Sequence, residues 1–332
     1  MFGDRVAHAR ERLGLTQARL AELSGVSRQM VSAVEANRHL PRVDAGQAMA
    51  AALGMSVAEL LDDGSAGVVG VLGQPLADGC RMRLSRVGDQ LVAWPVSVTE
   101  EGWVPADGIM DGGQVHARGR PSGAVVVGCD PAIGLLSRTG ERGPGIVAVP
   151  GSSAAGIESL ESGRTHGAIV HGPPGALPQP AIAIRRVHLA RWQVGLGGPA
   201  ELGRQAFEEV LDGRRPAIQR DEGAGSQQAL LRAVASRGAT VAGGPLAAGH
   251  VAAARRAAQD GAVAVTIEPV AHAMGLAFHP LEVHVAQLWL RAADAADGDA
   301  GRLVEAITSP AMQRQLRMIA GYDLTDAGSL VT

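Results

Sequence analysis

Three junctions between an expected strand and an expected helix place small or hydroxyl-bearing residues where the helix begins. They are Gly128-Cys129-Asp130-Pro131-Ala132, Pro150-Gly151-Ser152-Ser153 and Asp221-Glu222-Gly223-Ala224-Gly225-Ser226. Free backbone N–H groups and the positive end of the helix dipole meet there and attract anions. Glycine lets a ligand approach the backbone closely, and the serines supply neutral donors. The pattern predicts an anion-binding cleft, although helix capping explains any single junction equally well.

Metal binding and catalysis find less support in the residue types. We expect isolated structural histidines, because no compact metal-ligand spacing joins His166, His171, His250, His272, His279 and His284. Cys80 and Cys129 are far apart and indicate neither a disulfide framework nor a zinc site. Cys129 has no identifiable partner base, which favours a small buried thiol over a nucleophile. We therefore expect no catalytic residue, no metal and no cofactor beyond a possible oxyanion ligand.

The first sixty residues contain short apolar blocks at helical spacing. The buried faces of a first and a second helix are expected at Val6, Ala9, Leu13, Leu20 and Leu23. Thr16 caps the second helix, and Gly25 takes the positive φ that the following turn requires. Two further helices are expected at residues 43–53 and 57–61.

A third helix is expected from Ser27, its cap, to Glu35. Its core-facing residues are expected to be Met30, Val31 and Val34. Its outward polar residues are expected to be Arg28, Gln29 and Ser32. A small helical bundle with solvated polar faces is the alternative interpretation of this region.

The spacing resembles the helix-turn-helix of the lambda-repressor and Cro (XRE) family over about residues 4–62. The resemblance is carried by Leu15-Thr16-Gln17-Ala18-Arg19-Leu20-Ala21-Glu22-Leu23-Ser24-Gly25-Val26-Ser27, Val31-Ser32-Ala33-Val34-Glu35-Ala36-Asn37-Arg38 and Leu53-Gly54-Met55-Ser56-Val57. In that family the third helix enters the major groove by its N-terminal end. The resemblance implies that Arg28, Gln29 and Ser32 read base edges, since Arg and Gln form paired hydrogen bonds with guanine and adenine. It also places Ser27 in this interface.

Contacts with phosphates position such a unit without reading sequence. The resemblance assigns them to Gln17, Asn37 and Arg38. Residues 1–61 carry seven Arg and six acidic residues, so the unit is only weakly positive. Weak charge implies modest non-specific binding per subunit, which favours a homodimer on two half-sites of an operator.

A short polar, Gly-rich linker is expected at residues 62–67. Residues 68–122 then favour short strands, at 81–87 and at 90–98 after the Gly88-Asp89 turn signal. We interpret residues 63–122 as a linker and β-rich connector, to which we assign no function.

From residue 123 expected strands and helices alternate, which favours parallel sheets with helices on both faces. The expected strands are 124–127, 146–149, 168–170, 182–187, 194–196, 216–218 and 262–266. The expected helices are 131–136, 152–161, 202–211, 225–235 and 251–259.

Over about residues 123–328 the chain resembles the periplasmic-binding-protein-like domain found behind helix-turn-helix units in regulators of molybdate metabolism. The matching pieces are Gly128-Cys129-Asp130-Pro131-Ala132-Ile133-Gly134-Leu135-Leu136, Gly151-Ser152-Ser153, Gly163, Ala168-Ile169-Val170-His171, Arg220, Gly223-Ala224-Gly225-Ser226, Gly249-His250-Val251-Ala252, Ser309-Pro310 and Gly321-Tyr322-Asp323.

The resemblance implies a two-lobed domain that closes on a small ligand such as molybdate, tungstate or another oxyanion. The implied ligand-binding residues are Cys129, Asp130, Ser152, Ser153, His171, Gly225 and Ser226. Two departures weaken the case for a particular oxyanion. The family's Gly-Ser-Gly-Thr-Arg becomes Gly223-Ala224-Gly225-Ser226-Gln227, and its Ser-His-Asp becomes Gly128-Cys129-Asp130.

The 332 residues, 46% of them hydrophobic, suffice for two or three globular domains. No apolar run approaches the ~20 residues that span a bilayer, and the N-terminus lacks the apolar core of a signal peptide. We therefore expect a cytoplasmic protein without membrane contact. The expected domains are an all-α helix-turn-helix domain at 1–62, the connector at 63–122 and an α/β two-lobed domain at 123–332.

The sequence thus predicts a DNA-binding transcriptional regulator that senses a small ligand. One alternative keeps the DNA binding but makes the C-terminal domain a ligand-free dimerisation platform. A less favoured alternative is an enzyme that acts on a small acid or phosphate.

Overall fold

The computed structural model describes residues 2–55, 57, 60, 68–99, 102–117, 121, 123–136, 145–294 and 298–331. The chain forms two compact units, Met1–Val68 and Val69–Thr332. The expected linker at 62–67 lies outside the described residues, as does most of the expected helix at 57–61. No helix in the described part is long and apolar enough to cross a membrane.

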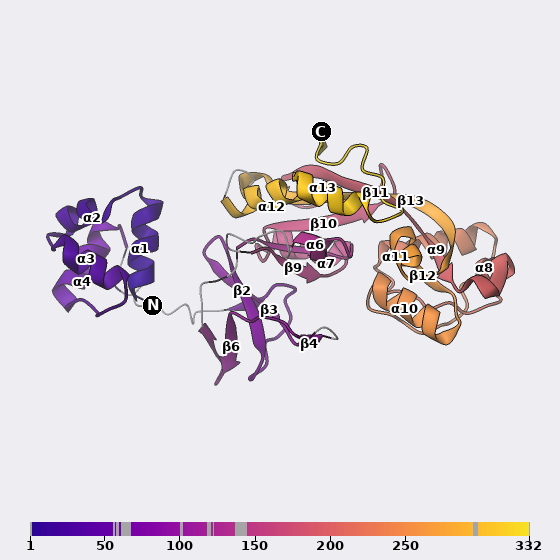
Figure 1. Ribbon diagram of the computed structural model, residues 1–332, viewed down its shortest axis with the longest axis horizontal. Coiled ribbons are helices and arrows are strands. Elements are labelled where there is room, and N and C mark those ends of the chain that lie inside the picture. Colours follow the sequence, from indigo (N-terminus) through magenta and orange to yellow (C-terminus); the bar gives the residue numbers. More distant parts are fainter. Residues whose placement is uncertain are drawn as a thin grey trace. The chain divides into compact units, whose positions relative to one another are not determined.

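The first unit is helical (Figure 1). Its described helices are α1 (Phe2–Arg12), α2 (Gln17–Ser24), α3 (Arg28–Glu35) and α4 (Val43–Ala52). The caps form as expected. Thr16 Oγ accepts a hydrogen bond from the backbone N of Arg19, and Gly25 ends α2 with φ 65°.

The core of this unit includes the fully buried Val6, Leu20 and Val31. Two expected core residues are on the surface, since Leu13 is 50% exposed and Leu23 is 47% exposed. Leu13 follows the end of α1. Leu23 lies on the outer side of α2, whose inner side is formed by Leu20, Ala21 and Ser24.

A five-stranded sheet opens the second unit, in the order β1-β3-β2-β6-β7. Its strands are β1 (Val69–Gly70), β2 (Arg81–Val87), β3 (Gln90–Pro95), β6 (Gly108–Asp111) and β7 (Gln114–Ala117), and a separate pair is β4 (Val98–Thr99) with β5 (Gly102–Trp103). Val71, Val87 and Val92 share a core with Val125 and Val149 of the next sheet. The β-rich segment is therefore packed into the same unit as the residues that follow it.

The principal sheet has the order β12-β11-β13-β10-β8-β9, with β14 paired to β11. Its strands are β8 (Val125–Gly128), β9 (Val147–Pro150), β10 (Gly167–Gly172), β11 (Ile184–Gly198), β12 (Ala264–Ile267), β13 (Ala277–Arg291) and β14 (Leu330–Val331). Only β8, β9 and β10 are parallel neighbours, while β11, β12 and β13 pair antiparallel. The expectation of parallel sheets therefore holds for β8, β9 and β10 and is wrong for the other strands of this sheet.

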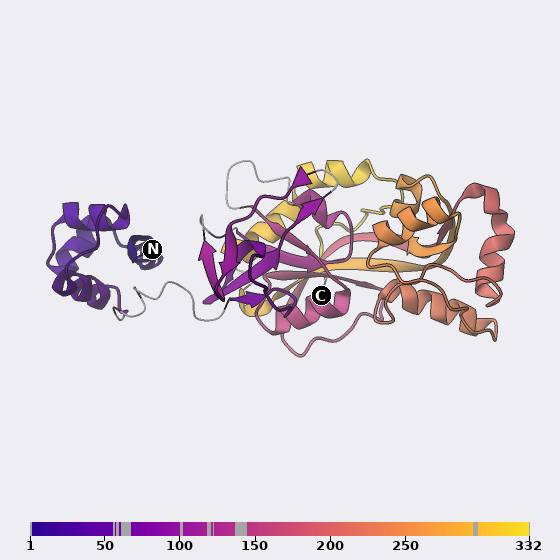
Figure 2. The ribbon, with the colours of Figure 1, turned by 90° about the horizontal axis from the view of Figure 1, so that it is seen from below.

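The long strands β11 and β13 make the sheet mixed, because they pair with each other in antiparallel fashion (Figure 2). The strands expected at 182–187 and 194–196 are parts of the single strand β11, and β13 was not expected. Register shifts at His188/Ala190 and Val194/Gly195 interrupt the alternation that identifies a strand. The strand expected at 216–218 is reduced to an isolated bridge between Ile218 and Ala264.

Helices cover this sheet at both ends (Figure 1). They are α6 (Ile133–Leu136), α7 (Ser153–Glu161), α8 (Gly203–Leu211), α9 (Gly225–Ser236), α10 (His250–Asp260), α11 (Glu268–Ala273), α12 (Gly298–Thr308) and α13 (Pro310–Arg317), with the 3-10 turns η1 (Ala200–Leu202) and η2 (Ala292–Asp294). The helix α7 packs on β10 and β8, whereas α10 packs on β12 and β11. The second unit thus has two groups of helices, one next to β8 and β10 and the other next to β12, and the strands β11 and β13 join them.

We predict that Trp289→Ala destabilises the second unit by about 3–5 kcal/mol, because it removes a fully buried aromatic side chain. The matched control is Trp103→Ala, at a 73% exposed position whose ring lies under Arg81. We expect the control substitution to lower the free energy of unfolding by about 1 kcal/mol or less. All four tryptophans follow residue 93, so tryptophan fluorescence during urea unfolding reports on the second unit. Equal losses in both variants would contradict this description of the core.

Candidate functional site

The outward surface of α3 lines a groove of about 540 Å³ in the first unit. The groove is lined by Gln17, Arg28, Gln29, Ser32, Ala33 and Arg38. Five of the seven predicted DNA-contact residues thus lie together. Arg28, Gln29 and Arg38 are exposed, while Val31 and Val34 of the same helix are buried.

The other two predicted residues have roles within the unit. Ser27 caps α3, because its Oγ accepts a hydrogen bond from the backbone N of Met30 at 3.1 Å. Asn37 has φ 52° and links the end of α3 to α1: its Oδ1 accepts from the backbone N of Gly3, and its Nδ2 donates to Asp4. Gln17 is also held, since its Nε2 donates to Glu35 Oε2 at 2.8 Å.

In the second unit, the ligand atoms of Cys129, His171 and His250 all lie within 4.8 Å of one another. His284 adjoins them, with its Nδ1 2.8 Å from His171 Nδ1. The prediction of isolated histidines is therefore wrong for three of the six. Sequence spacing missed this group because its members follow β8, lie in β10 and β13, and begin α10, far apart along the chain.

We call the group formed by Cys129, Asp130, His171, Trp192, Arg220, Ser226, His250, His284 and Tyr322 the polar cluster. Ring contacts connect Tyr322 to Trp192, and Trp192 to His171. Trp192 and His284 are directly opposite each other in the β11–β13 register. The polar cluster therefore lies along the two strands that join the helix groups.

Five side-chain atoms of this cluster are buried and have no hydrogen-bond partner among the described residues. They are Asp130 Oδ2, Trp192 Nε1, Arg220 Nη1, Ser226 Oγ and His250 Nδ1. Unpaired buried polar atoms are rare in folded proteins and are costly. Four of the five are donors or can act as donors, and the fifth is a carboxyl oxygen. Their concentration here makes the polar cluster the candidate ligand site of the second unit.

Asp130 and Arg220 are fixed by their other atoms. Asp130 Oδ1 accepts hydrogen bonds from the Tyr322 hydroxyl and from the backbone N of Ala132. Arg220 is only 4% exposed, and its Nε donates to the backbone oxygen of Ala247 at 3.1 Å. Burial raises the pKa of Asp130 and lowers that of Arg220. Removal from water therefore disfavours the charged form of each group.

Burial also favours the neutral forms of His171, His250 and Cys129. It lowers the pKa of His171 to about 3, with further contributions from His284 and Arg220. It lowers the pKa of His250 as well. Burial and the neighbouring Asp130 raise the pKa of the Cys129 thiol to about 12. At neutral pH the two imidazoles therefore have free lone pairs and the thiol is protonated.

Two of the remaining predicted ligand residues, Ser153 and Gly225, lie beside His171 of the polar cluster. Ser153 Oγ accepts a hydrogen bond from the backbone N of His171, and a Cβ at Gly225 would lie 3.2 Å from the His171 ring. Ser152 instead caps α7, since its Oγ accepts from the backbone N of Ala155. The capping interpretation thus accounts for the hydroxyl of Ser152. The sequence did not single out Trp192, Arg220, His284 or Tyr322 as ligand residues.

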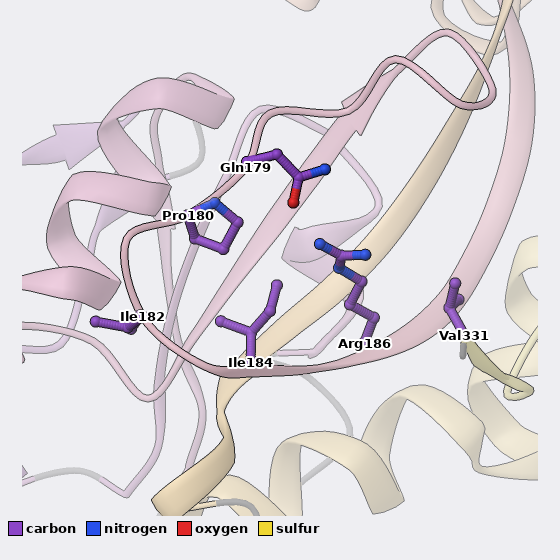
Figure 3. Close-up of a pocket in the computed structure, with 6 residues that line it drawn as sticks. All are labelled: Gln179, Pro180, Ile182, Ile184, Arg186 and Val331. Carbon is purple, nitrogen blue, oxygen red and sulfur yellow. The ribbon is translucent and has the colours of Figure 1, made fainter.

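A second groove, of about 290 Å³, lies against β11 and β14. Figure 3 shows Gln179, Ile184 and Arg186 facing the same space, with Val331 at its edge. It contains none of the predicted ligand residues.

Two family models match the chain. The helix-turn-helix model HTH_3 matches residues 6–60, and a PBP superfamily domain model matches residues 138–308. No curated protein sequence matches it.

Solved structures also resemble parts of the chain. The N-terminal DNA-binding domain of SinR from Bacillus subtilis is 33% identical, over 19% of this chain and 93% of that one, with a TM-score of 0.19. This chain spans 62% of the matched chain in the SinR–SinI complex. An OxyR mutant of Corynebacterium glutamicum is 11% identical, over 58% of this chain and 63% of that one, with a TM-score of 0.43.

Each family match lies within one of the two compact units. The helix-turn-helix match covers the helices that form the groove, and the PBP match covers just over half of the chain, including most of the polar cluster. The chain therefore belongs to the PBP superfamily, and its residues 6–60 match a helix-turn-helix domain.

Proposed function

We propose that the protein is a transcriptional regulator that binds operator DNA through α3 and changes its DNA affinity when a small ligand occupies the polar cluster. The observation that carries this proposal is the set of unpaired, buried polar atoms in a domain joined to a helix-turn-helix unit. We place its action inside the cell, where the operator is.

The groove along α3 has the chemistry for reading DNA. Arg28 and Gln29 open the helix and are exposed, so their planar donor groups are free to approach guanine and adenine edges in the major groove. Arg38, which also lines the groove, carries a positive charge that suits a phosphate contact. The weak net charge of the unit supports two subunits on two half-sites, and we propose a homodimer.

The polar cluster favours an anion as the effector. Arg220, Trp192 and Ser226 have N–H or O–H groups without partners, and α9 begins beside Ser226. Burial raises the pKa of Asp130, which lessens the repulsion that this carboxyl group exerts on an anion. Molybdate and tungstate are the ligands that we propose to test first, beside sulfate and phosphate.

Regulation requires that the ligand bind one conformation more tightly than another. A tenfold change in DNA affinity needs a coupling of only ~1.4 kcal/mol. A ligand-free dimerisation platform would leave the unpaired polar atoms permanently buried, at about 1–3 kcal/mol each. That cost favours a ligand-binding domain. We propose no catalytic role, and turnover of small acids or phosphate esters by the purified protein would contradict this.

We predict that Arg28→Ala and Gln29→Ala each weaken binding to operator DNA. A paired hydrogen bond with a base contributes about 1–3 kcal/mol, so we expect losses of about 5-fold to 150-fold per contact. The measurement is fluorescence anisotropy with a duplex from upstream of the protein's own gene. The control is Arg19→Ala, which removes the same charge from an exposed Arg that pairs with Glu22 and does not line the groove. Unchanged affinity in both test variants would exclude α3 as the reading helix.

We predict that Ser226→Ala reduces ligand binding and leaves the DNA affinity of the ligand-free protein unchanged. In a thermal-shift assay with the four oxyanions, a ligand at a hundred times its Kd adds ~2.7 kcal/mol of stability. The control is Ser236→Ala on the same helix, where the serine is exposed and bonds only to the backbone of Ala233. An equal shift in wild type and Ser226→Ala would contradict the assignment of the site, and no shift with any anion would contradict an oxyanion effector.

A further inference from the structure

We propose that Cys129, His171 and His250 together bind one transition-metal ion of the borderline-soft class, such as Zn²⁺ or Co²⁺. The inference names a further ligand for the polar cluster. It rests on the proposed function only where it concerns DNA affinity, and the binding of the ion is independent of that function.

The geometry is close to that of a bound ion. One atom from each residue lies within 4.8 Å of the other two. Zn–N and Zn–S bonds of about 2.0–2.3 Å place tetrahedral ligands about 3.5 Å apart, so the side chains have to move inward by about 1 Å. The three residues come from different elements, namely the end of β8, β10 and the start of α10. Their convergence is therefore a product of the fold and not of local sequence.

The unpaired Nδ1 of His250 is an independent observation that points to a ligand. His250 is 2% exposed, and this nitrogen has no partner among the described residues. A bound metal ion would give this buried nitrogen the partner that it lacks among the described residues.

His171 is held in place as metal-binding histidines commonly are. Its Nδ1 contacts His284 Nδ1, which leaves its Nε2 available for the ion. His284 Nε2 in turn contacts Glu282 Oε1 at 2.6 Å, and Glu282 is paired with Arg232. Such a chain of hydrogen bonds behind a ligand fixes the ring and its tautomer.

The ligand types determine the class of ion. One thiolate and two imidazoles suit Zn²⁺, Co²⁺ and copper, whereas Mg²⁺ and Ca²⁺ require oxygen ligands. Three protein ligands leave the fourth tetrahedral position open. On binding, the Cys129 thiol gives its proton to solvent, and the thiolate forms the S–metal bond.

Arg220 is the group that opposes a cation here, because its charge acts on all three ligand residues. The thiolate formed at Cys129 compensates for part of that charge, and Asp130 beside it supplies a carboxyl oxygen without a partner. An anion in the open fourth position would contact both the ion and the nearby guanidinium.

The test is a titration of the metal-free full chain with Co²⁺, followed by near-ultraviolet absorption. A Co²⁺–thiolate bond gives an intense charge-transfer band that nitrogen and oxygen ligands do not give. We expect one Co²⁺ per chain, with this band present in wild type and displaced by Zn²⁺. The band should disappear in Cys129→Ser and remain in Cys80→Ser, which alters the other, partly buried cysteine.

His250→Gln is the second variant, and it keeps a similar volume in case Cys129→Ser disturbs folding. We expect at least a tenfold loss of Co²⁺ affinity in this variant. Absence of the charge-transfer band in folded wild-type protein would overturn the proposal, as would a band that Cys80→Ser removes and Cys129→Ser does not.

Operator affinity with and without Zn²⁺ separates this inference from the proposed function. A Co²⁺–thiolate band without any effect of Zn²⁺ on DNA affinity supports the metal site and limits its role to the C-terminal unit. A response of DNA affinity to an oxyanion without any Co²⁺–thiolate band overturns the metal site and leaves the proposed function intact.

Discussion

The antiparallel pairing of β11 with β13 is the interaction on which the second unit depends. It runs from Ile184 opposite Arg291 to Gly198 opposite Ala277. One end of the pair joins the parallel strands through β10, and the other joins β12. Both helix groups are therefore attached to the same two strands. Any change in the twist of these strands moves one group relative to the other, which is the kind of motion that a hinged domain uses.

The polar cluster lies in this joining region, and the burial of its polar atoms lowers the stability of the fold. Trp192 and His284 face each other across the two strands, and Arg220, Ser226 and His250 come from the helix group next to β12. The buried atoms of Trp192, Arg220, Ser226 and His250 that have no partner among the described residues carry a cost in folding free energy. A ligand that pairs with them stabilises the arrangement of both helix groups at once. Ligand binding and domain geometry are thus linked through the same atoms.

Local signals were sufficient to predict much of the first unit. Thr16, Gly25 and Ser27 act through residues three or four positions away, so their caps and turn are visible in the sequence. Leu23 shows the limit, because only the packing of α2 decides which side of the helix is buried.

In the second unit the junctions that follow β8 and β9 were predictable for the same local reason, and Cys129 and Asp130 were found through the first of them. The association of His171 with His250 and His284 was not predictable. It depends on β13, whose strand pattern in the sequence is broken by Pro280 and Glu282 and whose pairing with β11 contains register shifts.

The central claim is that α3 reads a specific DNA sequence as part of a dimer. The most direct measurement is selection of bound duplexes from a random-sequence library by the purified full chain, followed by sequencing. The account predicts one enriched motif made of two inverted half-sites whose centres lie about 10–10.5 base pairs apart, or a multiple of that spacing. Recovery of duplexes without any common sequence would contradict it.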